Sequence, residues 1–344
     1  MRAVLLADGK LVVQDVPKPS PGYEEALIKI TTAGICHSDV HLVKGDWPSF
    51  VRPFPTRMGH EGIGIVEELG PGAEQFIQKG DRVILGLGGS GGGYWCGACE
   101  YCLSGRPRLC KQTKGIIGTF AEYISVWVKS LVKLPDEISD KEVPLACGGL
   151  TAYSAVKKLI KFDVLPGKPV AIIGAAGGLG HYAVQVARAF GYKVVGVDVG
   201  QGKIEFVKSL GADYAVDISE APEFVKEKFG GVYASIVFSP KIAGFELGLK
   251  LLKRGGVFIG VGMPAVNDGP ISITPVELLG KDPLIMSSAV GTVEEMRELI
   301  QLAADGKVKT HVGRVASLSE ISKVLDELDQ GKYTGRAIID DMTK

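Results

Sequence analysis

The chain has 344 residues, which is enough for two domains that each bury a hydrophobic core. Lys plus Arg and Asp plus Glu are equal at 39 each, so the composition gives no reason to expect nucleic acid or an anionic membrane as a partner. No apolar run approaches the roughly 20 residues of a membrane span. The opening segment MRAVLLADGK reaches charged residues too early for a secretory signal, so we expect a cytoplasmic protein.

Short β-branched runs separated by glycine turns fill the first part of the chain, up to about residue 135. The runs are VLLADGKLVVQDV, EALIKITTAG, GIGIVEELG and GDRVILGLG. Strands of this length with frequent turns predict a mostly β region of the barrel or sandwich type. We interpret the glycine-rich run GLGGSGGG at 86–93 as a flexible loop.

Strands alternate with helical patterns from about residue 145 onward. PVAIIG is followed by the helical segment LGHYAVQVARAFG and then by YKVVGVD. One face of that helix is apolar and carries Ala183, Val186, Ala187 and Phe190. The alternation continues through ASIVFS, FELGLKLLKRGG and VFIGVGM, and it predicts a doubly wound parallel sheet with helical crossovers. After about residue 285 we expect one more helix, EEMRELIQLAADGK, and a strand-like tail, RAIIDD.

Four of the six cysteines lie in one short stretch, CGACEYCLSGRPRLC. They are Cys96, Cys99, Cys102 and Cys110, with the spacing C-x2-C-x2-C-x7-C. Clustered cysteines in a reducing cytosol are more often metal ligands than disulfides, and four thiolates suit a closed, structural Zn²⁺ site. An iron–sulfur cluster is the rival interpretation, but its bacterial motif ends with a shorter gap and a proline, whereas Lys111 follows the last cysteine here.

The other two cysteines are far apart in the chain. Cys36 opens CHSDVH, Cys147 lies in PLACGGLTAY, and the histidine His60 lies in GHEG. Two thiolates and one imidazole form a catalytic zinc set that leaves a fourth position for water or substrate. A lone buried cysteine is nevertheless more often a small hydrophobe. The spacing by itself leaves both interpretations open.

A glycine-rich turn follows the strand PVAIIG and opens the next helix, which is the position required of a dinucleotide-binding turn. Its residues are Gly174, Gly177, Gly178, Leu179 and Gly180. The first glycine stands one place earlier than in G-x-G-x-x-G, whereas Gly177 and Gly180 keep the expected spacing. Asp198 ends the next strand, YKVVGVD. A carboxylate there accepts hydrogen bonds from the adenosine ribose and repels a 2′-phosphate, so we expect NAD rather than NADP.

Motifs along essentially the whole chain resemble the zinc-dependent medium-chain alcohol dehydrogenases. In chain order they are GICHSDVH, GHEGIGIVEELG, GDRV, CGACEYCLSG, GTFAEY, PLACGGLTAY, GAAGGLG and GRAIID. The resemblance implies an α/β fold in which a doubly wound (Rossmann) NAD domain is joined to a mostly β, GroES-like catalytic domain. It implies residues 151–285 for the NAD domain. Residues 1–150 and 286–344 are the implied catalytic domain, with a structural zinc lobe at 94–112.

The same resemblance gives a role to each of the six cysteines. Cys36, His60 and Cys147 match the ligands of a catalytic zinc, and the four clustered cysteines match a structural zinc site. Asp39 matches a carboxylate that hydrogen-bonds the ligating histidine and fixes its ring. Glu61, beside His60, resembles a residue that reaches the metal when the fourth position is vacant. Two Zn²⁺ ions per chain are therefore expected.

Contacts with the nucleotide are implied in the same way. Lys203 resembles a second contact to the ribose. His37 and Arg336 resemble residues that meet the pyrophosphate, a role that suits the forked guanidinium of arginine. Thr151 resembles a residue that packs on the nicotinamide.

Three residues near Cys36 are implied to serve the substrate. Ser38 and His41 resemble a relay that carries the alcohol proton from the substrate hydroxyl through the ribose to solvent. Trp47 resembles one wall of the substrate pocket. The implied reaction is hydride transfer between a small primary or secondary alcohol and NAD, with Zn²⁺ stabilising the alkoxide, to give an aldehyde or ketone.

Two alternatives stay open. Segments 85–95 and 111–120 depart from the family pattern, so the same fold and metal acting on a polyol or another hydroxyl compound is one alternative. A zinc-stabilised binding protein without enzymatic activity is the alternative from a different class. Because NAD domains of this family commonly pair across a subunit interface, we also expect a homo-oligomer.

Overall fold

The structure is a computed structural model that describes residues 1–47, 56–86 and 93–344. The chain divides into two compact units. The first comprises Met1–Leu150, Val290–Gly306 and Thr310–Lys344, and the second comprises Thr151–Ala289 and Lys307–Lys309. Most of the glycine-rich run 86–93 that we interpreted as a loop lies outside the described residues. Within the described ranges, no helix is both long enough and apolar enough to span a bilayer.

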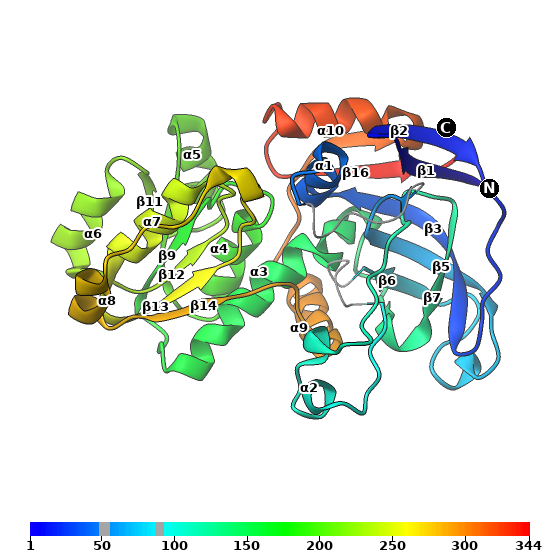
Figure 1. Ribbon diagram of the computed structural model, residues 1–344, viewed down its shortest axis with the longest axis horizontal. Helices are drawn as coiled ribbons and strands as arrows, with labels where there is room; N and C mark the ends of the chain where they lie inside the picture. Colours follow the sequence, from blue (N-terminus) through cyan, green and yellow to red (C-terminus); the bar gives the residue numbers. More distant parts are fainter. Residues whose placement is uncertain (48–55, 87–92) are drawn as a thin grey trace. The chain divides into compact units, whose positions relative to one another are not determined.

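A mainly antiparallel sheet of seven strands is the largest element of the first unit (Figure 1). Its order is β15-β16-β3-β5-β6-β8, and β7 pairs with β3 off this path. These strands are β3 (Glu25–Ile35), β5 (Glu61–Leu69), β6 (Arg82–Leu85), β7 (Tyr123–Trp127), β8 (Val132–Lys133), β15 (Val312–Ser317) and β16 (Arg336–Asp341). A smaller sheet has the order β2-β1-β4, formed by β1 (Arg2–Ala7), β2 (Lys10–Asp15) and β4 (Thr56–Arg57). The predicted mostly β region is confirmed.

Short helices connect these strands and close the core of the first unit. The α-helices are α1 (His37–Lys44), α2 (Glu100–Leu103), α9 (Val293–Ala304) and α10 (Ile321–Asp329). The 3₁₀ helices are η2 (Ala73–Gln75), η3 (Pro107–Leu109), η4 (Val128–Ser130), η5 (Asp140–Ala146) and η8 (Leu318–Glu320). Helices α1 and α10 pack side by side, and Lys44 Nζ lies 2.7 Å from Asp329 Oδ1 (Figure 1). Helix α1 is thereby held next to the end of β3, the strand that precedes it in the chain.

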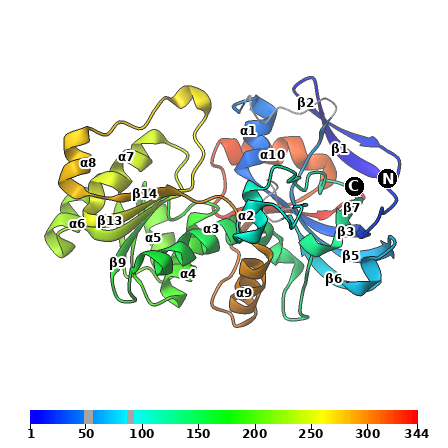
Figure 2. The ribbon, with the colours of Figure 1, turned by 60° about the horizontal axis from the view of Figure 1, so that its bottom comes forward.

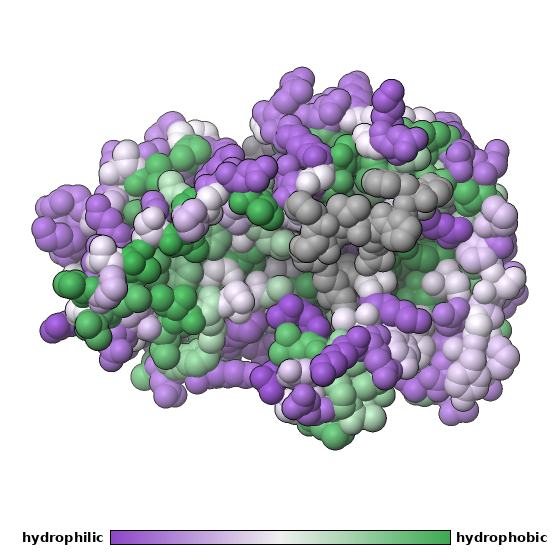
Figure 3. Space-filling model, in the orientation of Figure 1, coloured by the Kyte–Doolittle hydropathy of each residue, from purple (hydrophilic) through white to green (hydrophobic). Residues whose placement is uncertain are grey.

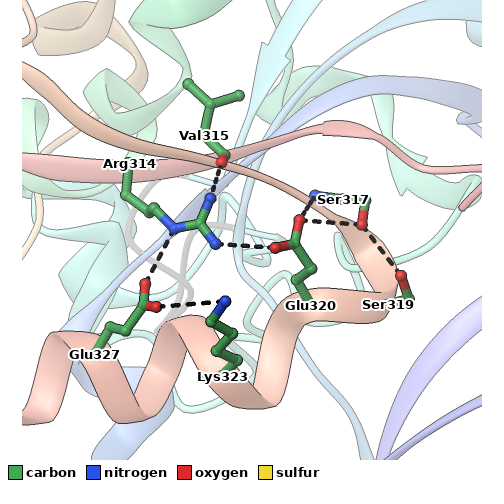
Figure 4. A network of polar contacts seen from close by, with 7 residues as sticks. All are labelled: Arg314, Val315, Ser317, Ser319, Glu320, Lys323 and Glu327. Carbon is green, nitrogen blue, oxygen red and sulfur yellow. Dashed lines mark hydrogen bonds and ion pairs between the residues drawn. The ribbon is translucent and has the colours of Figure 1, made fainter.

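The prediction of a single helix after residue 285 is wrong, because both α9 and α10 follow that point, with β15 between them. The segment ISKVLDELD forms α10, whose apolar face is buried. Figure 4 shows how this helix is tied to the neighbouring strand: Arg314 of β15 donates to Glu327 at 3.0 Å and to Glu320 at 2.9 Å. Strand β15 pairs in turn with β16, the strand that carries Arg336, so these ion pairs tie α10 to that side of the sheet.

A six-stranded parallel sheet runs through the second unit in the order β11-β10-β9-β12-β13-β14. Its strands are β9 (Pro169–Ile173), β10 (Lys193–Asp198), β11 (Tyr214–Asp217), β12 (Val232–Val237), β13 (Leu252–Gly260) and β14 (Leu284–Ser287). The central strand β9 is buried from Val170 to Ile173, which requires cover on both faces.

Helices supply that cover, and Figure 2 shows α4 and α7 on opposite faces of the parallel sheet. The helices are α3 (Gly148–Lys157), η6 (Lys158–Phe162), α4 (Gly180–Ala189), α5 (Gln201–Ser209), α6 (Ala221–Phe229), α7 (Ile242–Leu251), η7 (Val266–Asp268) and α8 (Pro275–Lys281). Strands alternate with crossover helices throughout, so the predicted doubly wound fold is confirmed.

Candidate active site and metal centres

The four clustered cysteines converge in the loop that contains α2 and η3. The Sγ atoms of Cys99 and Cys102 are 3.5 Å apart. The Cys96 Sγ lies 3.5 Å from that of Cys110 and 3.9 Å from that of Cys102. Four sulfurs bound tetrahedrally at about 2.3 Å from one Zn²⁺ are separated by about 3.8 Å, so this set fits a zinc ion. Backbone N–H groups of Ala98 and Cys99 lower the pKa of the Cys96 thiol to about 6, which favours the thiolate that a metal needs.

A second ligand set is buried in the first unit. Cys36 directly follows β3 and His60 directly precedes β5, and these strands pair antiparallel with Gly34 opposite Glu61. Cys147 follows η5. Ligand atoms of Cys36, His60, Glu61 and Cys147 all lie within 4.8 Å of one another. Two sulfurs, one imidazole and a neighbouring carboxylate are donors that Zn²⁺ accepts, so these residues fit a second zinc ion.

The two thiols of this set are linked to each other. A hydrogen bond from Cys147, opposed by burial, lowers the pKa of Cys36 well below its usual value. The same hydrogen bond together with burial raises the pKa of Cys147 well above its usual value. A metal bound here requires both sulfurs as thiolates. It would therefore displace the proton that the two sulfurs share.

Asp39, on the first turn of α1, connects two members of this set. Its Oδ2 accepts a hydrogen bond from the Cys36 N–H at 2.9 Å, and its Oδ1 lies 3.3 Å from Nδ1 of His60. Burial lowers the pKa of His60, but the Asp39 carboxylate and Cys36 outweigh it and raise that pKa well above its usual value. A carboxylate on Nδ1 holds the ring and leaves Nε2 as the nitrogen available to a metal. The role that the resemblance implies for Asp39 stays a prediction.

Arg336 and Glu61 form a buried ion pair beside the second set. Nη2 of Arg336 donates to the two oxygens of Glu61 at 2.6 and 2.7 Å, and to the carbonyl of Ile35 at 3.0 Å. Burial raises the pKa of Glu61 to about 7, although Arg336 opposes the shift. A Cβ on Gly34 would lie 2.0 Å from the Glu61 carboxylate, so the close approach of the two strands requires glycine there. The expected pyrophosphate contact of Arg336 stays a prediction.

The expected relay residues lie on α1 with His37. The Sγ of Cys36 and the Oγ of Ser38 are 3.6 Å apart, so the serine hydroxyl borders the second ligand set. Nδ1 of His41 lies 2.7 Å from Oδ2 of Asp46. The rings of His37 and His41 are 5.0 Å apart, and burial together with the charge of His41 lowers the pKa of His37.

Asp46 was not among the residues predicted for this site, although its neighbour Trp47 was. Gly45 adopts a left-handed conformation with φ of +70° and ends α1. A glycine directly after a helical segment is the signal of such an ending, and the residue after it turns back over the last turn. That signal was present in the sequence.

The glycine-rich turn lies in the second unit, between β9 and α4. Gly174 has φ of +78°, and a Cβ there would approach Ser239 N to 2.9 Å. A Cβ on Gly180 would lie 2.0 Å from the carbonyl oxygen of Gly174. Gly177 and Gly178 complete the turn, and Leu179 directly precedes α4. The turn is therefore as tight as close approach of a pyrophosphate to backbone N–H groups requires.

Asp198 ends β10 beside this turn. Its Oδ2 accepts a hydrogen bond from Ala176 N–H and its Oδ1 accepts one from Val199 N–H, both at 2.8 Å. Lys203 Nζ, on α5, lies 3.5 Å from Asp198 Oδ1. Thr151 is buried on α3 at the start of the second unit. The structure thus brings the carboxylate, the lysine and the glycine turn together at one end of the sheet.

A Rossmann unit and a mostly β unit with two zinc-type ligand sets define a class, the zinc-binding nicotinamide-dependent dehydrogenases. A family model described as alcohol dehydrogenase GroES-like domain matches residues 22–136, and one described as zinc-binding dehydrogenase matches residues 178–305. An alcohol dehydrogenase of Geobacillus stearothermophilus is 41% identical to this chain, over 98% of this chain and 99% of that protein.

Solved structures agree with this class. The alcohol dehydrogenase of the archaeon Aeropyrum pernix has a TM-score of 0.87 at 34% identity, covering 98% of this chain and 99% of that one. An NAD-dependent alcohol dehydrogenase has a TM-score of 0.87 at 27% identity, with the same coverage of 98% and 99%. The chain belongs to the zinc-dependent medium-chain alcohol dehydrogenase family.

Proposed function

We propose that this alcohol dehydrogenase transfers hydride between small primary or secondary alcohols and NAD, and that Cys36, His60 and Cys147 hold its catalytic zinc. The observation that carries the proposal is the buried set of ligand atoms, all within 4.8 Å of one another. Asp39 supports it, because a carboxylate on the far nitrogen of a ligating histidine is the usual second contact of a zinc site.

Zinc and NAD, when bound, supply a Lewis acid that favours loss of the hydroxyl proton and an acceptor for the hydride. The chain supplies ligation, orientation and a route for the proton. Ser38, whose hydroxyl borders Cys36, receives the proton of the alcohol. His41 then transfers this proton toward solvent, since imidazole takes and releases protons near neutral pH. Glu61, paired with Arg336, is a carboxylate held within reach of the metal position.

The nucleotide roles are part of the same proposal. Gly174, Gly177, Gly178, Leu179 and Gly180 shape the turn that receives the pyrophosphate. Asp198, with Lys203, accepts the ribose hydroxyls and disfavours a 2′-phosphate, which supports NAD over NADP. We also assign His37 and Arg336 to the pyrophosphate and Thr151 to the nicotinamide, by resemblance to the family.

Isotope transfer tests the proposed reaction. An alcohol carrying deuterium on its hydroxyl-bearing carbon should yield NADH that contains the deuterium. His60→Ala should abolish this transfer and remove one zinc per chain. NADH without the label, or full turnover by His60→Ala, would contradict the proposal.

We also propose that the chain assembles as a homo-oligomer through the edge strand β14. Leu284 and Ile285 of this strand are 49% and 51% exposed, and Val276 and Leu279 of α8 are 78% and 83% exposed. Figure 3 shows apolar residues gathered over the face of the second unit where these elements lie. A strand with a free edge and apolar neighbours is a template for pairing, and the same strand of a second copy complements it.

A cytoplasmic location is the last part of the proposal. All six cysteines are free thiols, and each belongs to one of the two ligand sets. A reducing compartment preserves such thiols for metal binding. Absence of the protein from a cytosolic fraction would contradict this location.

A further inference from the structure

Asp46 and His41 are joined by the turn that ends helix α1. The N–H of Asp46 donates to the carbonyl of His41 at 3.1 Å, and the N–H of Gly45 donates to the carbonyl of Leu42 at 3.3 Å. These two bonds, with the left-handed Gly45, fold the chain back over the last turn of the helix. The Asp46 carboxylate thereby reaches His41, with Oδ2 at 2.7 Å from Nδ1.

The face of the His41 ring is held as well as its edge. The Trp47 ring stacks on the His41 ring with a centroid distance of 4.4 Å and an interplanar angle of 28°. Trp47 is 7% exposed, and the side chains of His41 and Asp46 are 12% and 26% exposed. A carboxylate at the edge and an indole on the face restrict both rotation and tilt of the imidazole.

We propose that Asp46 is a positioning residue that fixes His41 in the tautomer with its hydrogen on Nδ1, so that Nε2 is the nitrogen that accepts the relayed proton. An ionised carboxylate can only accept hydrogen bonds, so the ring nitrogen facing it must carry the hydrogen. The lone pair of the neutral ring is then on Nε2 alone. This inference rests on the relay role of His41 proposed above.

The proton balance of the step follows from this arrangement. Nε2 takes one proton from the relay, and the ring becomes an imidazolium whose positive charge faces the Asp46 carboxylate. Nε2 then releases the same proton toward solvent and the ring returns to the neutral Nδ1–H form. The Asp46 carboxylate faces the ring in both forms and stabilises the positively charged form, as the aspartate of a Ser-His-Asp triad does.

Nuclear magnetic resonance of the zinc-replete protein tests the tautomer without any substrate. The chain has five histidines, so a ¹⁵N-histidine-labelled sample gives few ring signals, and loss of one set in His41→Gln assigns His41. In the wild type, at a pH where the ring is neutral, we expect protonated Nδ1 and unprotonated Nε2. In Asp46→Ala this preference should be lost. An Nε2–H tautomer in the wild type, or an unchanged tautomer in the variant, would overturn the inference.

Kinetics tests whether the positioning matters for turnover. We expect Asp46→Ala to lower kcat for alcohol oxidation about 10-fold to 100-fold with little change in KM, and added formate to restore part of the loss. Asp46→Asn, which keeps the shape but not the charge, should also lose activity and should not respond to formate. Asp329→Ala, which breaks the ion pair with Lys44 on the same helix, is the matched control and should stay within about 2-fold of the wild type.

The two levels of the proposal can fail separately. If the wild type oxidises alcohols and Asp46→Ala is as fast, the positioning role of Asp46 is wrong and the proposed function stands. If the wild type oxidises no alcohol, the proposed function is wrong. The magnetic resonance measurement of the His41 tautomer still shows whether Asp46 fixes the ring.

Discussion

The Arg336 guanidinium donates to both oxygens of the Glu61 carboxylate, at 2.6 and 2.7 Å, although the two residues are 275 positions apart in the chain. Arg336 is 3% exposed and Glu61 is fully buried. The pair joins the start of β16, the last strand, to the start of β5, where the second ligand set lies. A charge buried this deeply must be matched by an opposite charge, which makes the pair sensitive to loss of either member.

Arg336→Leu should destabilise the protein by about 3–5 kcal/mol at pH 8, because the Glu61 carboxylate loses its counter-charge. The loss should be smaller at low pH. The pKa of Glu61 is already raised from 4.5 to about 7 in the folded protein. Protonation of Glu61 therefore adds to the folding stability below pH 4.5, and this added stability is lost as the pH rises through about 7. Without Arg336 the pKa of Glu61 rises further, so the loss of this stability with rising pH occurs at a higher pH.

Urea unfolding of the wild type and Arg336→Leu at pH 6 and pH 8 measures this difference. The double variant Glu61→Gln with Arg336→Leu is the control, since a neutral amide needs no counter-charge and should recover part of the stability at pH 8. Equal unfolding midpoints for the wild type and the single variant at both pH values would show that the ion pair is not needed.

Zinc content should separate the two ligand sets. Cys36→Ser should leave one zinc per chain and abolish turnover, because a serine hydroxyl does not replace a thiolate as a ligand. Cys102→Ser should also leave one zinc, and it should lower the melting temperature, since a structural zinc supplies folding energy. Elemental analysis of the purified variants decides the matter. Two zincs retained in Cys36→Ser would refute the catalytic ligand assignment.

Cofactor preference should depend on the charge of Asp198. Asp198→Asn removes the repulsion of a 2′-phosphate and weakens acceptance of the ribose hydroxyls, so the ratio of kcat/KM for NAD⁺ to that for NADP⁺ should fall about 10-fold to 100-fold. Asp217→Asn is the matched control, because Asp217 ends the adjacent strand β11 and accepts a hydrogen bond from Gly200 N–H at 3.0 Å. An equal change of this ratio in both variants would mean that Asp198 does not set the cofactor preference by contacting the ribose.

The oligomer should depend on the edge strand β14. Ile285→Lys, alone or with Leu279→Glu, should lower the mass measured by light scattering toward that of a single chain, since buried charge opposes pairing of the two edges. Leu165→Lys is the control, because Leu165 is 59% exposed but lies in the loop before β9. An unchanged mass for both β14 variants would place the interface elsewhere.

Local patterns were sufficient to predict most of the fold and the four-cysteine set. Cys96 to Cys110 are close in sequence, so their spacing alone indicates a shared metal. The turn Gly174–Gly180 was also visible, since it needs glycines at positions where a Cβ would collide with backbone. The helix α10 was missed, although Ser317 and Glu320 form a capping box directly before it.

Contacts across the sheet could not be predicted from the residues alone. Cys36 and His60 meet because β3 and β5 pair with Gly34 opposite Glu61, and a pairing register is a tertiary property. The resemblance to the family implied that these residues are zinc ligands, whereas their spacing in the sequence left that role open. Two contacts, that of Arg336 with Glu61 and that of Asp46 with His41, depend on the placement of side chains. The periodicity of a sequence does not predict such placement.

The most direct test of the central claim is NADH formation by the purified protein with both zinc sites filled. A panel of short primary and secondary alcohols and polyols should be offered with NAD⁺ and with NADP⁺ in parallel. The account predicts turnover of simple alcohols with NAD⁺ and much slower turnover with NADP⁺. No NADH from any alcohol, by protein shown to hold two zinc ions per chain, would contradict it.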